Sequence, residues 1–259
     1  MSYIRRDWES HDSRFRICEK YHSFRAQPQN PKVKERRCPR TGEGTGVKQK
    51  IINVRQSTSN LTRLLMDNFR IGDWYLTLSL KKLVKQEEME KAYSSLMREL
   101  RKFYRKKGQE LKYVSVIENK AGRGRPHLHI IMNGRDIPFM ELKPVLEKHW
   151  LLGQAYLKNY SGGATDAKKL ASYFTKEDIV NKKGVTEEEL EKELGQRGRL
   201  RASRNLIRTK PTVKTISRSD TFRDEMKPPT GYRLVKELSY SGVNEDGYAY
   251  QHAVYERDG

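Results

Sequence analysis

Alternating apolar and polar positions predict short strands in the middle of the chain. Every second residue from Trp74 to Leu80 is apolar, and the residues between are tyrosine, threonine and serine, so one face of this strand should be buried. A second strand is expected over Lys112–Glu118, which is rich in β-branched and aromatic residues, and a third over Arg125–Met132. Because glycines and a proline mark the connection between the last two, we expect them to form an antiparallel hairpin.

Helical periodicity is clearest over residues 86–106. Its apolar positions advance by four, three, four and three residues, which places them on one face of a helix: Met89, Tyr93, Leu96, Leu100 and Phe103. Further helices are expected over residues 57–69, 139–150, 163–177 and 186–195, and another strand over residues 154–160. The pattern predicts an α+β fold, with an antiparallel sheet of about four or five strands and helices packed on one face.

The composition divides the chain into three parts. Residues 1–60 are polar, basic and rich in glycine and proline, which predicts a partly disordered N-terminal extension. Residues 61–182 carry the predicted sheet and its helices. Residues 183–259 should form a C-terminal extension with an acidic helix, a basic segment without acidic residues from Arg197 to Arg218, and a terminal hairpin over residues 232–255.

The net charge of +20 and the isoelectric point of about 9.9 indicate a polyanionic partner, because solubility alone would need a smaller charge. Two cysteines, Cys18 and Cys38, fit a reducing cytoplasm, and their spacing with His11 and His22 matches no common zinc finger. No apolar run has the length of a membrane span, and no apolar segment follows the basic N-terminus as in a signal peptide. The phosphate-binding loop of many ATPases is also absent from the sequence.

A candidate metal site lies on the predicted hairpin. His127 and His129 are two residues apart on a strand, so both imidazoles should point to the same face, opposite Leu128 and Ile130. Glu118 ends the neighbouring strand and can lie across from them. Two imidazoles and a carboxylate suit Mn²⁺ or Mg²⁺ with open coordination positions. The alternative is that both histidines are simply polar residues on a solvated face.

A candidate nucleophile follows on the helix predicted over residues 163–177. Tyr173 and Lys176 are three residues apart and therefore neighbours on a helix surface. A phenol, whose ordinary pKa is near 10, needs help to attack, and a metal or a lysine can stabilise the charge that develops on a phosphate. Tyr156 and Tyr160 also have the spacing of a tyrosine pair, but glycines follow at once and no lysine stands at the matching offset.

The order of these motifs resembles that of the HUH endonucleases, specifically the single-tyrosine rolling-circle replication initiators (Rep) of plasmids and phages. The resemblance rests on the strand from Trp74 to Leu80, on His127-Leu128-His129 and on Tyr173 followed by Lys176, and it covers roughly residues 60–180. Relaxases of the same superfamily place the tyrosine before the histidines. The resemblance implies an RRM/ferredoxin-like nuclease fold over residues 61–182.

The activity that this resemblance implies is metal-dependent nicking and joining of single-stranded DNA through a 5′-phosphotyrosine intermediate. Tyr173 would be the nucleophile, Lys176 would steady the phosphate or the phenolate, and Glu177 and Asp178 are candidates to supplement the metal shell. The metal ligands would be Glu118, His127 and His129. We expect single-stranded or locally melted origin DNA as substrate, and a host helicase and polymerase as partners.

DNA contacts are expected from the basic residues beside these motifs, and a solvated basic surface is the alternative. They are Lys120, Arg123, Arg125, Arg199, Arg201, Arg204 and Arg208. Two other functions stay open on the sequence alone. One is an HUH-type transposase that cuts single-stranded ends, and the other is a non-catalytic RRM-like nucleic-acid binder whose histidines are incidental.

Overall fold

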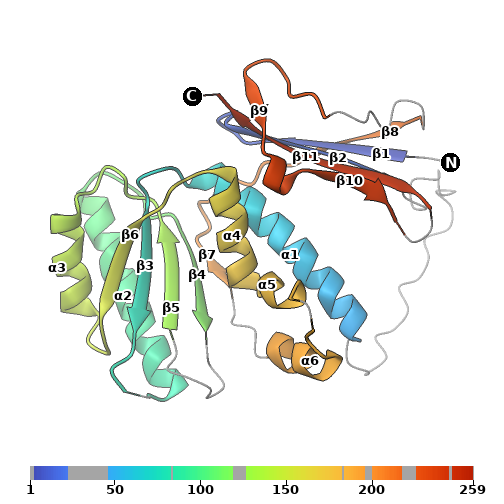
Figure 1. Ribbon diagram of the computed structural model, residues 1–259. Helices are drawn as coiled ribbons and strands as arrows, with labels where there is room; N and C mark the ends of the chain where they lie inside the picture. Colours follow the sequence, from blue (N-terminus) through green and yellow to red (C-terminus); the bar gives the residue numbers. More distant parts are fainter. Residues whose placement is uncertain are drawn as a thin grey trace, which may run out of the picture. The chain divides into compact units, whose positions relative to one another are not determined.

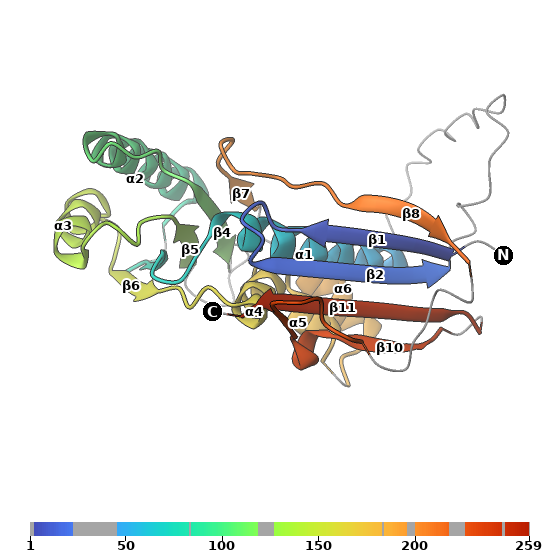
Figure 2. The same ribbon diagram turned by 90° about the horizontal axis from the view of Figure 1, so that it is seen from above.

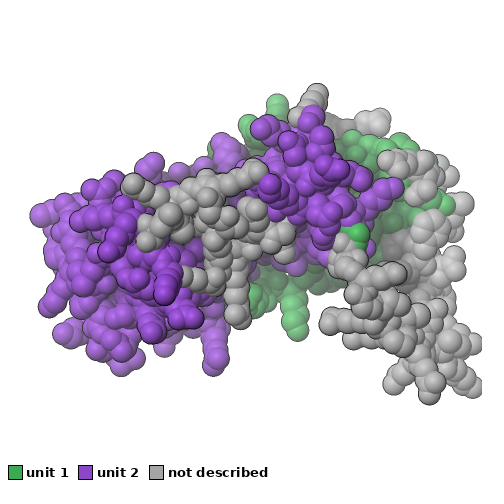
Figure 3. All heavy atoms as spheres, turned by 90° about the horizontal axis from the view of Figure 1, so that it is seen from below, with its two compact units in different colours: residues 1–46, 208–259 green, residues 47–207 purple. Residues whose placement is uncertain are grey.

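The computed structural model describes residues 3–22, 46–82, 84–118, 127–182, 184–195, 200–217, 226–244 and 247–258, and for Gln86 and Glu118 the backbone alone. The chain forms two compact units (Figure 3). Unit 1 comprises residues 1–46 and 208–259, and unit 2 comprises residues 47–207. Each unit is described by itself.

Unit 2 contains a five-stranded antiparallel sheet, as the alternation of the sequence predicts. The strand order is β6-β3-β5-β4-β7, and every pair of neighbours is antiparallel. The strands are β3 (Trp74–Ser79), β4 (Tyr113–Glu118), β5 (His127–Met132), β6 (Ala155–Asn159) and β7 (Arg201–Ala202). The helices are α1 (Val47–Asn68), α2 (Gln86–Lys106), α3 (Phe139–His149), α4 (Ala164–Thr175), α5 (Glu177–Val180) and α6 (Glu187–Gly195). The fold class is therefore α+β.

One face of this sheet packs on α2 and α3 (Figure 1). The alternate apolar residues of β3, among them Leu76 and Leu78, join those of β5 and the apolar stripe of α2 in a single core. Leu96 and Leu100 of that stripe are fully buried. The observed bounds of α2 coincide with the predicted ones, because the four-and-three spacing of its apolar residues extends over the whole helix.

The opposite face is only partly open, which differs from the expected arrangement with helices on one face. Val114, Val116 and Ile131 point to this face and are buried. Helices α1 and α4 lie on this side of the sheet (Figure 2). The two helices are joined by a buried hydrogen bond of 2.6 Å between the Thr58 and Thr175 hydroxyls. Half of the face is therefore covered, and the half over β3 and β6 stays accessible.

Helix α4 begins and ends at sharp backbone turns. Gly162 precedes it with a φ of +80°, and a Cβ there would lie 2.3 Å from the Ile71 backbone nitrogen, so only glycine fits. Lys176 stands after Thr175 in the left-handed region, with a φ of 62°. The chain then continues as the short helix α5. The sequence predicts one helix through residue 177, and the left-handed residue interrupts it.

Unit 1 is a six-stranded antiparallel sheet built from both ends of the chain (Figure 2). Its order is β10-β11-β2-β1-β8, and β9 also pairs with β11. The strands are β1 (Tyr3–Glu9), β2 (Phe15–His22), β8 (Thr212–Ile216), β9 (Tyr232–Leu234), β10 (Tyr240–Val243) and β11 (Ala249–Arg257), with a 3₁₀ turn, η2 (Lys236–Leu238).

This unit divides the chain differently from the sequence-based division at residues 60 and 182. Residues 3–22 form two central strands, and Trp8 and Phe15 are buried. The strands that cover them, β8 and β11, follow about 190 residues or more later in the chain. Local composition does not reveal partners at such a distance, which is why the first 60 residues resemble an extension.

Candidate active site

The open half of the sheet in unit 2 gathers polar side chains by strand register. Thr77 of β3 pairs with His129 of β5 and with Tyr156 of β6, and Ser79 pairs with His127. Directly paired residues of antiparallel strands share a face. The two histidines therefore lie on the same face as the hydroxyl groups of the alternating strand β3, as the sequence predicts.

His129 is the most constrained of these side chains. Its ring is 7% exposed, and its Nδ1 lies 2.9 Å from the Tyr75 hydroxyl and 3.2 Å from the Thr77 hydroxyl. Its Nε2 lies 3.1 Å from the Tyr173 hydroxyl. Hydroxyl groups therefore fix the orientation of the imidazole on both sides, and they decide which nitrogen carries the proton.

Tyr173 reaches this histidine from the last turn of α4 (Figure 1). Its ring meets the His129 ring edge to face, with 5.3 Å between the ring centroids, and 38% of the residue is exposed. The adjacent Phe174 is 2% exposed and packs near the same imidazole. The buried bond from Thr175 to Thr58 of α1 also fixes this end of the helix. The tyrosine hydroxyl is thus held against His129 and remains accessible.

The residues present fit a divalent cation in their chemistry. The His127 and His129 rings are 6.3 Å apart between centroids, and the backbone of Glu118 pairs directly with His127. The hydroxyls at His129 Nδ1 suit a metal ligand, because such a histidine usually bonds through its second ring nitrogen to a fixed partner. Within the described residues, no group of three or more His, Cys, Asp or Glu side chains could hold a metal ion. The Glu118 side chain lies outside them.

A shallow hollow of about 580 Å³ lies beside His127 on the open half of the sheet. Ser79, Gln154 and Tyr156 line it, and the Tyr156 hydroxyl donates a hydrogen bond to Gln154 Oε1. Tyr156 is 53% exposed on a strand, and Tyr160 is buried. The pair Tyr156 and Tyr160 therefore lacks the helical setting of a two-tyrosine motif.

The residues that follow Tyr173 are engaged in ion pairs. The Lys176 ammonium lies 3.2 Å from the Glu193 carboxylate of α6. The Glu177 carboxylate is 5% exposed and accepts hydrogen bonds from Lys168 and from the Ser172 hydroxyl. Asp178 is exposed. Of these predicted site residues, the structure brings only Tyr173 to His129.

The predicted DNA-binding residues fall in three settings. Lys120, Arg123, Arg125 and Arg199 lie outside the described residues. Arg201 belongs to β7, forms an ion pair of 2.6 Å with Glu90 and stacks on the Tyr93 ring. Arg204 in unit 2 and Arg208 in unit 1 are exposed.

The segment around Arg201 is fixed to unit 2. The Ser203 backbone N–H donates to the Tyr113 carbonyl, and the Ile207 N–H donates to the Asn68 side chain. Residues 201–207 therefore complete the edge of the sheet, which the basic composition of the segment does not indicate.

Sequence reasoning did not assign Tyr75 and Thr77 to the site. Both stand on the polar side of the alternating strand β3, and the register of β3 against β5 brings them to His129 Nδ1. Their signal in the sequence is the regular placement of hydroxyl groups at every second position.

Comparison with known proteins supports one assignment. Residues 73–178 match the family model described as replication-associated protein ORF2. The match covers less than half of the chain and includes β3, the histidine pair and Tyr173. It associates this part of unit 2 with replication initiators. Neither the curated proteins nor the solved structures contain a significant match to this chain.

Proposed function

We propose that this protein nicks and rejoins single-stranded DNA at a replication origin and thereby initiates rolling-circle replication of a plasmid or phage. One observation carries the proposal: the Tyr173 hydroxyl lies 3.1 Å from His129 Nε2, inside the segment that matches replication-associated proteins. An accessible tyrosine hydroxyl against a fixed imidazole on an open sheet is a suitable arrangement for attack on an extended strand.

The proposed reaction is a transesterification. The Tyr173 oxygen attacks the scissile phosphorus, a tyrosine–phosphorus bond forms, and the bond from phosphorus to the 3′ oxygen breaks. The phenol loses its proton, and the departing 3′ oxygen gains one. The products are a 5′-phosphotyrosine and a free 3′-hydroxyl that a polymerase can extend. Because one phosphodiester replaces another, rejoining needs no ATP, in agreement with the absence of a Walker-type phosphate-binding loop from the sequence.

The proposed cofactor is Mn²⁺ or Mg²⁺, held by His127, His129 and Glu118. A divalent cation supplies charge stabilisation to the phosphoryl oxygens when it is bound. The protein's own residues prepare this site. A proton on Nδ1, donated to Tyr75 or Thr77, leaves the Nε2 lone pair of His129 directed to the side of Tyr173.

The open half of the sheet supports a path for the DNA strand toward Tyr173. Tyr75, Thr77 and Ser79 on β3, with Tyr156 on β6, present rings and hydroxyl groups there. Strand-borne aromatic residues also stack bases in RRM-like modules, so a non-catalytic nucleic-acid binder is the second candidate function. That candidate assigns no role to the contact between Tyr173 and His129. A host helicase and polymerase complete the proposal as partners.

The test is a cleavage assay on single-stranded origin oligonucleotides, with and without Mn²⁺. We expect a covalent protein–DNA adduct that depends on the cation and disappears in Tyr173→Phe, whose DNA affinity stays unchanged because only the hydroxyl is lost. Tyr156→Phe is the matched control, since it removes an exposed hydroxyl from the same face. An adduct that persists in Tyr173→Phe and disappears in Tyr156→Phe would overturn the assignment, and binding without any adduct would favour the second candidate.

A further inference from the structure

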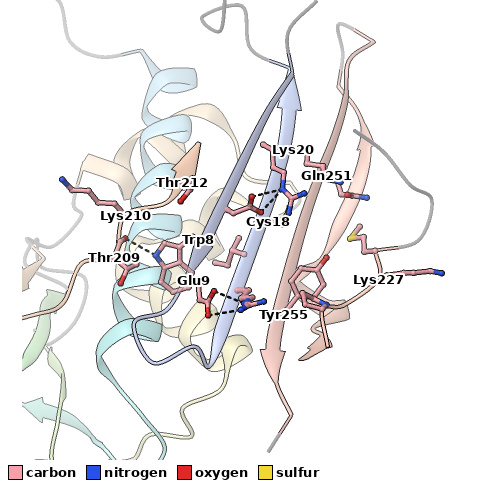
Figure 4. Close-up of a pocket in the computed structure, with 16 residues that line it drawn as sticks. Trp8, Glu9, Cys18, Lys20, Thr209, Lys210, Thr212, Lys227, Gln251 and Tyr255 are labelled. Carbon is pink, nitrogen blue, oxygen red and sulfur yellow. Dashed lines mark hydrogen bonds and ion pairs between the residues drawn. The ribbon is translucent and has the colours of Figure 1, made fainter. Parts of the chain in front are cut away.

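A basic groove lies on the sheet of unit 1, a part of the chain to which the proposed nicking reaction gives no role (Figure 4). It has a volume of about 750 Å³. Three rows of paired residues from β1, β2 and β11 form its floor, and Asp7 and Cys18 make up the middle row. Residues 209–212 line one side, and residues 226–229 line the other.

The lining is positively charged. Five cationic side chains face two carboxylates, which gives the groove a net charge of +3: Arg5, Arg16, Lys20, Lys210 and Lys227 against Asp7 and Glu9. Both carboxylates are already paired, Asp7 with Arg5 at 2.8 Å and Glu9 with Arg16 at 3.0 Å. The three lysines are therefore in excess of the carboxylates in the groove, and their charge favours an anionic ligand.

The floor keeps this charge at neutral pH. A hydrogen bond from Asp7 raises the pKa of Arg5, and hydrogen bonds from Ser13 and Arg16 lower the pKa of Glu9. Burial, with the nearby Asp7 charge, raises the pKa of the Cys18 thiol to about 11, so the thiol stays neutral. The Arg16 Nε–H is buried and has no aligned hydrogen-bond acceptor among the residues that the structure describes.

The positions of the cations suit an extended ligand. Lys20 lies toward one end of the floor and Arg16 at the other, with Lys210 and Lys227 on opposite sides (Figure 4). Rows two residues apart are separated by about 7 Å, so three rows extend over about 14 Å. That length corresponds to roughly four nucleotides of one strand at the duplex spacing of ~3.4 Å. A single phosphate would instead require cations that converge on one point.

The aromatic side chains in the groove favour a duplex over a single strand. Trp8 and Tyr255 are 2% and 8% exposed, so neither offers an open ring face on which a base could stack. Single-strand binding sites combine cations with such stacking surfaces. Backbone contact alone suits a duplex, whose bases remain stacked inside.

We propose that this groove binds the sugar–phosphate backbone of duplex DNA. The choice of DNA rests on the proposed function, since DNA beside a replication origin is double-stranded. Binding here would hold the chain on the duplex independently of base sequence, while Tyr173 acts on an exposed single strand.

The experiment uses the full chain and a blunt DNA duplex, and it measures affinity by fluorescence anisotropy at several salt concentrations. The groove variant replaces Lys20, Lys210 and Lys227 by glutamine. We expect it to bind the duplex about tenfold more weakly, with a log–log salt slope lower by about 0.9 for each phosphate that the variant no longer neutralises. Replacement of the same three lysines by arginine should restore both quantities, because it keeps the charge.

The matched control removes equal charge from exposed positions on α2 and α3 by the triple substitution Lys91→Gln, Lys106→Gln and Lys148→Gln. Equal losses of affinity in groove variant and control would overturn the proposal, as would an unchanged salt slope, an absence of duplex binding by the unaltered chain, or a loss confined to single strands. Cleavage of a saturating single-stranded oligonucleotide is measured in parallel. If the unaltered chain cleaves nothing but the duplex effect is present, the groove stands and the nicking function fails.

Discussion

At the scale of single residues, the site depends on hydroxyl groups around one imidazole. Tyr75, Thr77 and Tyr173 all contact His129, which is nearly buried, whereas His127 is half-buried. The two histidines of one motif therefore have different structural weight, although the sequence presents them as equivalent.

Separate substitution of the two histidines tests this difference. His129→Ala removes hydrogen bonds to three hydroxyl groups and should lower the free energy of unfolding by about 1–3 kcal/mol, whereas His127→Ala should change it by less than about 0.5 kcal/mol. Urea unfolding without divalent cations measures both. Cation-dependent cleavage should disappear in each variant, and full cleavage in either one would contradict its role as a ligand.

Cys18 provides a test by pH. Because its pKa is raised to about 11, the neutral thiol dominates at pH 8, and alkylation should proceed more than about a hundredfold more slowly than at a free cysteine of pKa ~8.5. The rate should rise about tenfold for each pH unit up to about pH 11. Iodoacetamide labelling of a Cys38→Ser variant, followed by mass spectrometry, measures this rate. Labelling at pH 8 as fast as that of free cysteine would contradict the assigned burial.

At the scale of elements, the end of α4 positions the candidate nucleophile. The helix is fixed to α1 by the Thr58–Thr175 bond and stops at Lys176, whose left-handed backbone leads into α5. The Lys176 ammonium contacts Glu193 of α6. Its predicted role at the phosphate therefore requires exchange of this ion pair for the substrate.

Two substitutions separate the two roles of Lys176. Lys176→Met removes both the ion pair and the positive charge, and we expect single-turnover cleavage to fall at least about tenfold. Glu193→Gln removes the ion pair but keeps the ammonium, so cleavage should persist, with a loss of stability of up to about 1 kcal/mol. Equal effects of both variants on cleavage would reduce Lys176 to a structural residue.

At the scale of the whole molecule, the two units have separate cores. The core between α2, α3 and their sheet contains only residues 74–157, whereas the sheet of unit 1 combines both ends of the chain. No helix among the described residues is long and apolar enough to cross a membrane. The candidate active site and the basic groove thus belong to different units, and each can be altered alone.

A fragment of residues 47–207 tests this independence. It contains every strand of the five-stranded sheet and the segment that matches replication-associated proteins. We expect cooperative unfolding in urea and cleavage of single-stranded oligonucleotides at the rate of the full chain. Its affinity for duplex DNA should be lower, because the groove is absent. An unfolded fragment would show that unit 2 needs unit 1 for its stability.

The sequence by itself determined the elements that have a strong local period and the motifs that they carry. The bounds of α2 follow from its apolar spacing, and the common face of His127 and His129 follows from the alternation of a strand. Only the tertiary structure decided which distant segments meet. The pairing of β1 and β2 with β8 and β11, the approach of Tyr173 to His129 and the ion pair of Lys176 with Glu193 depend on packing between separate elements. The physical reason is that a local pattern specifies which face of an element is buried, but it contains no information about the partner that buries it.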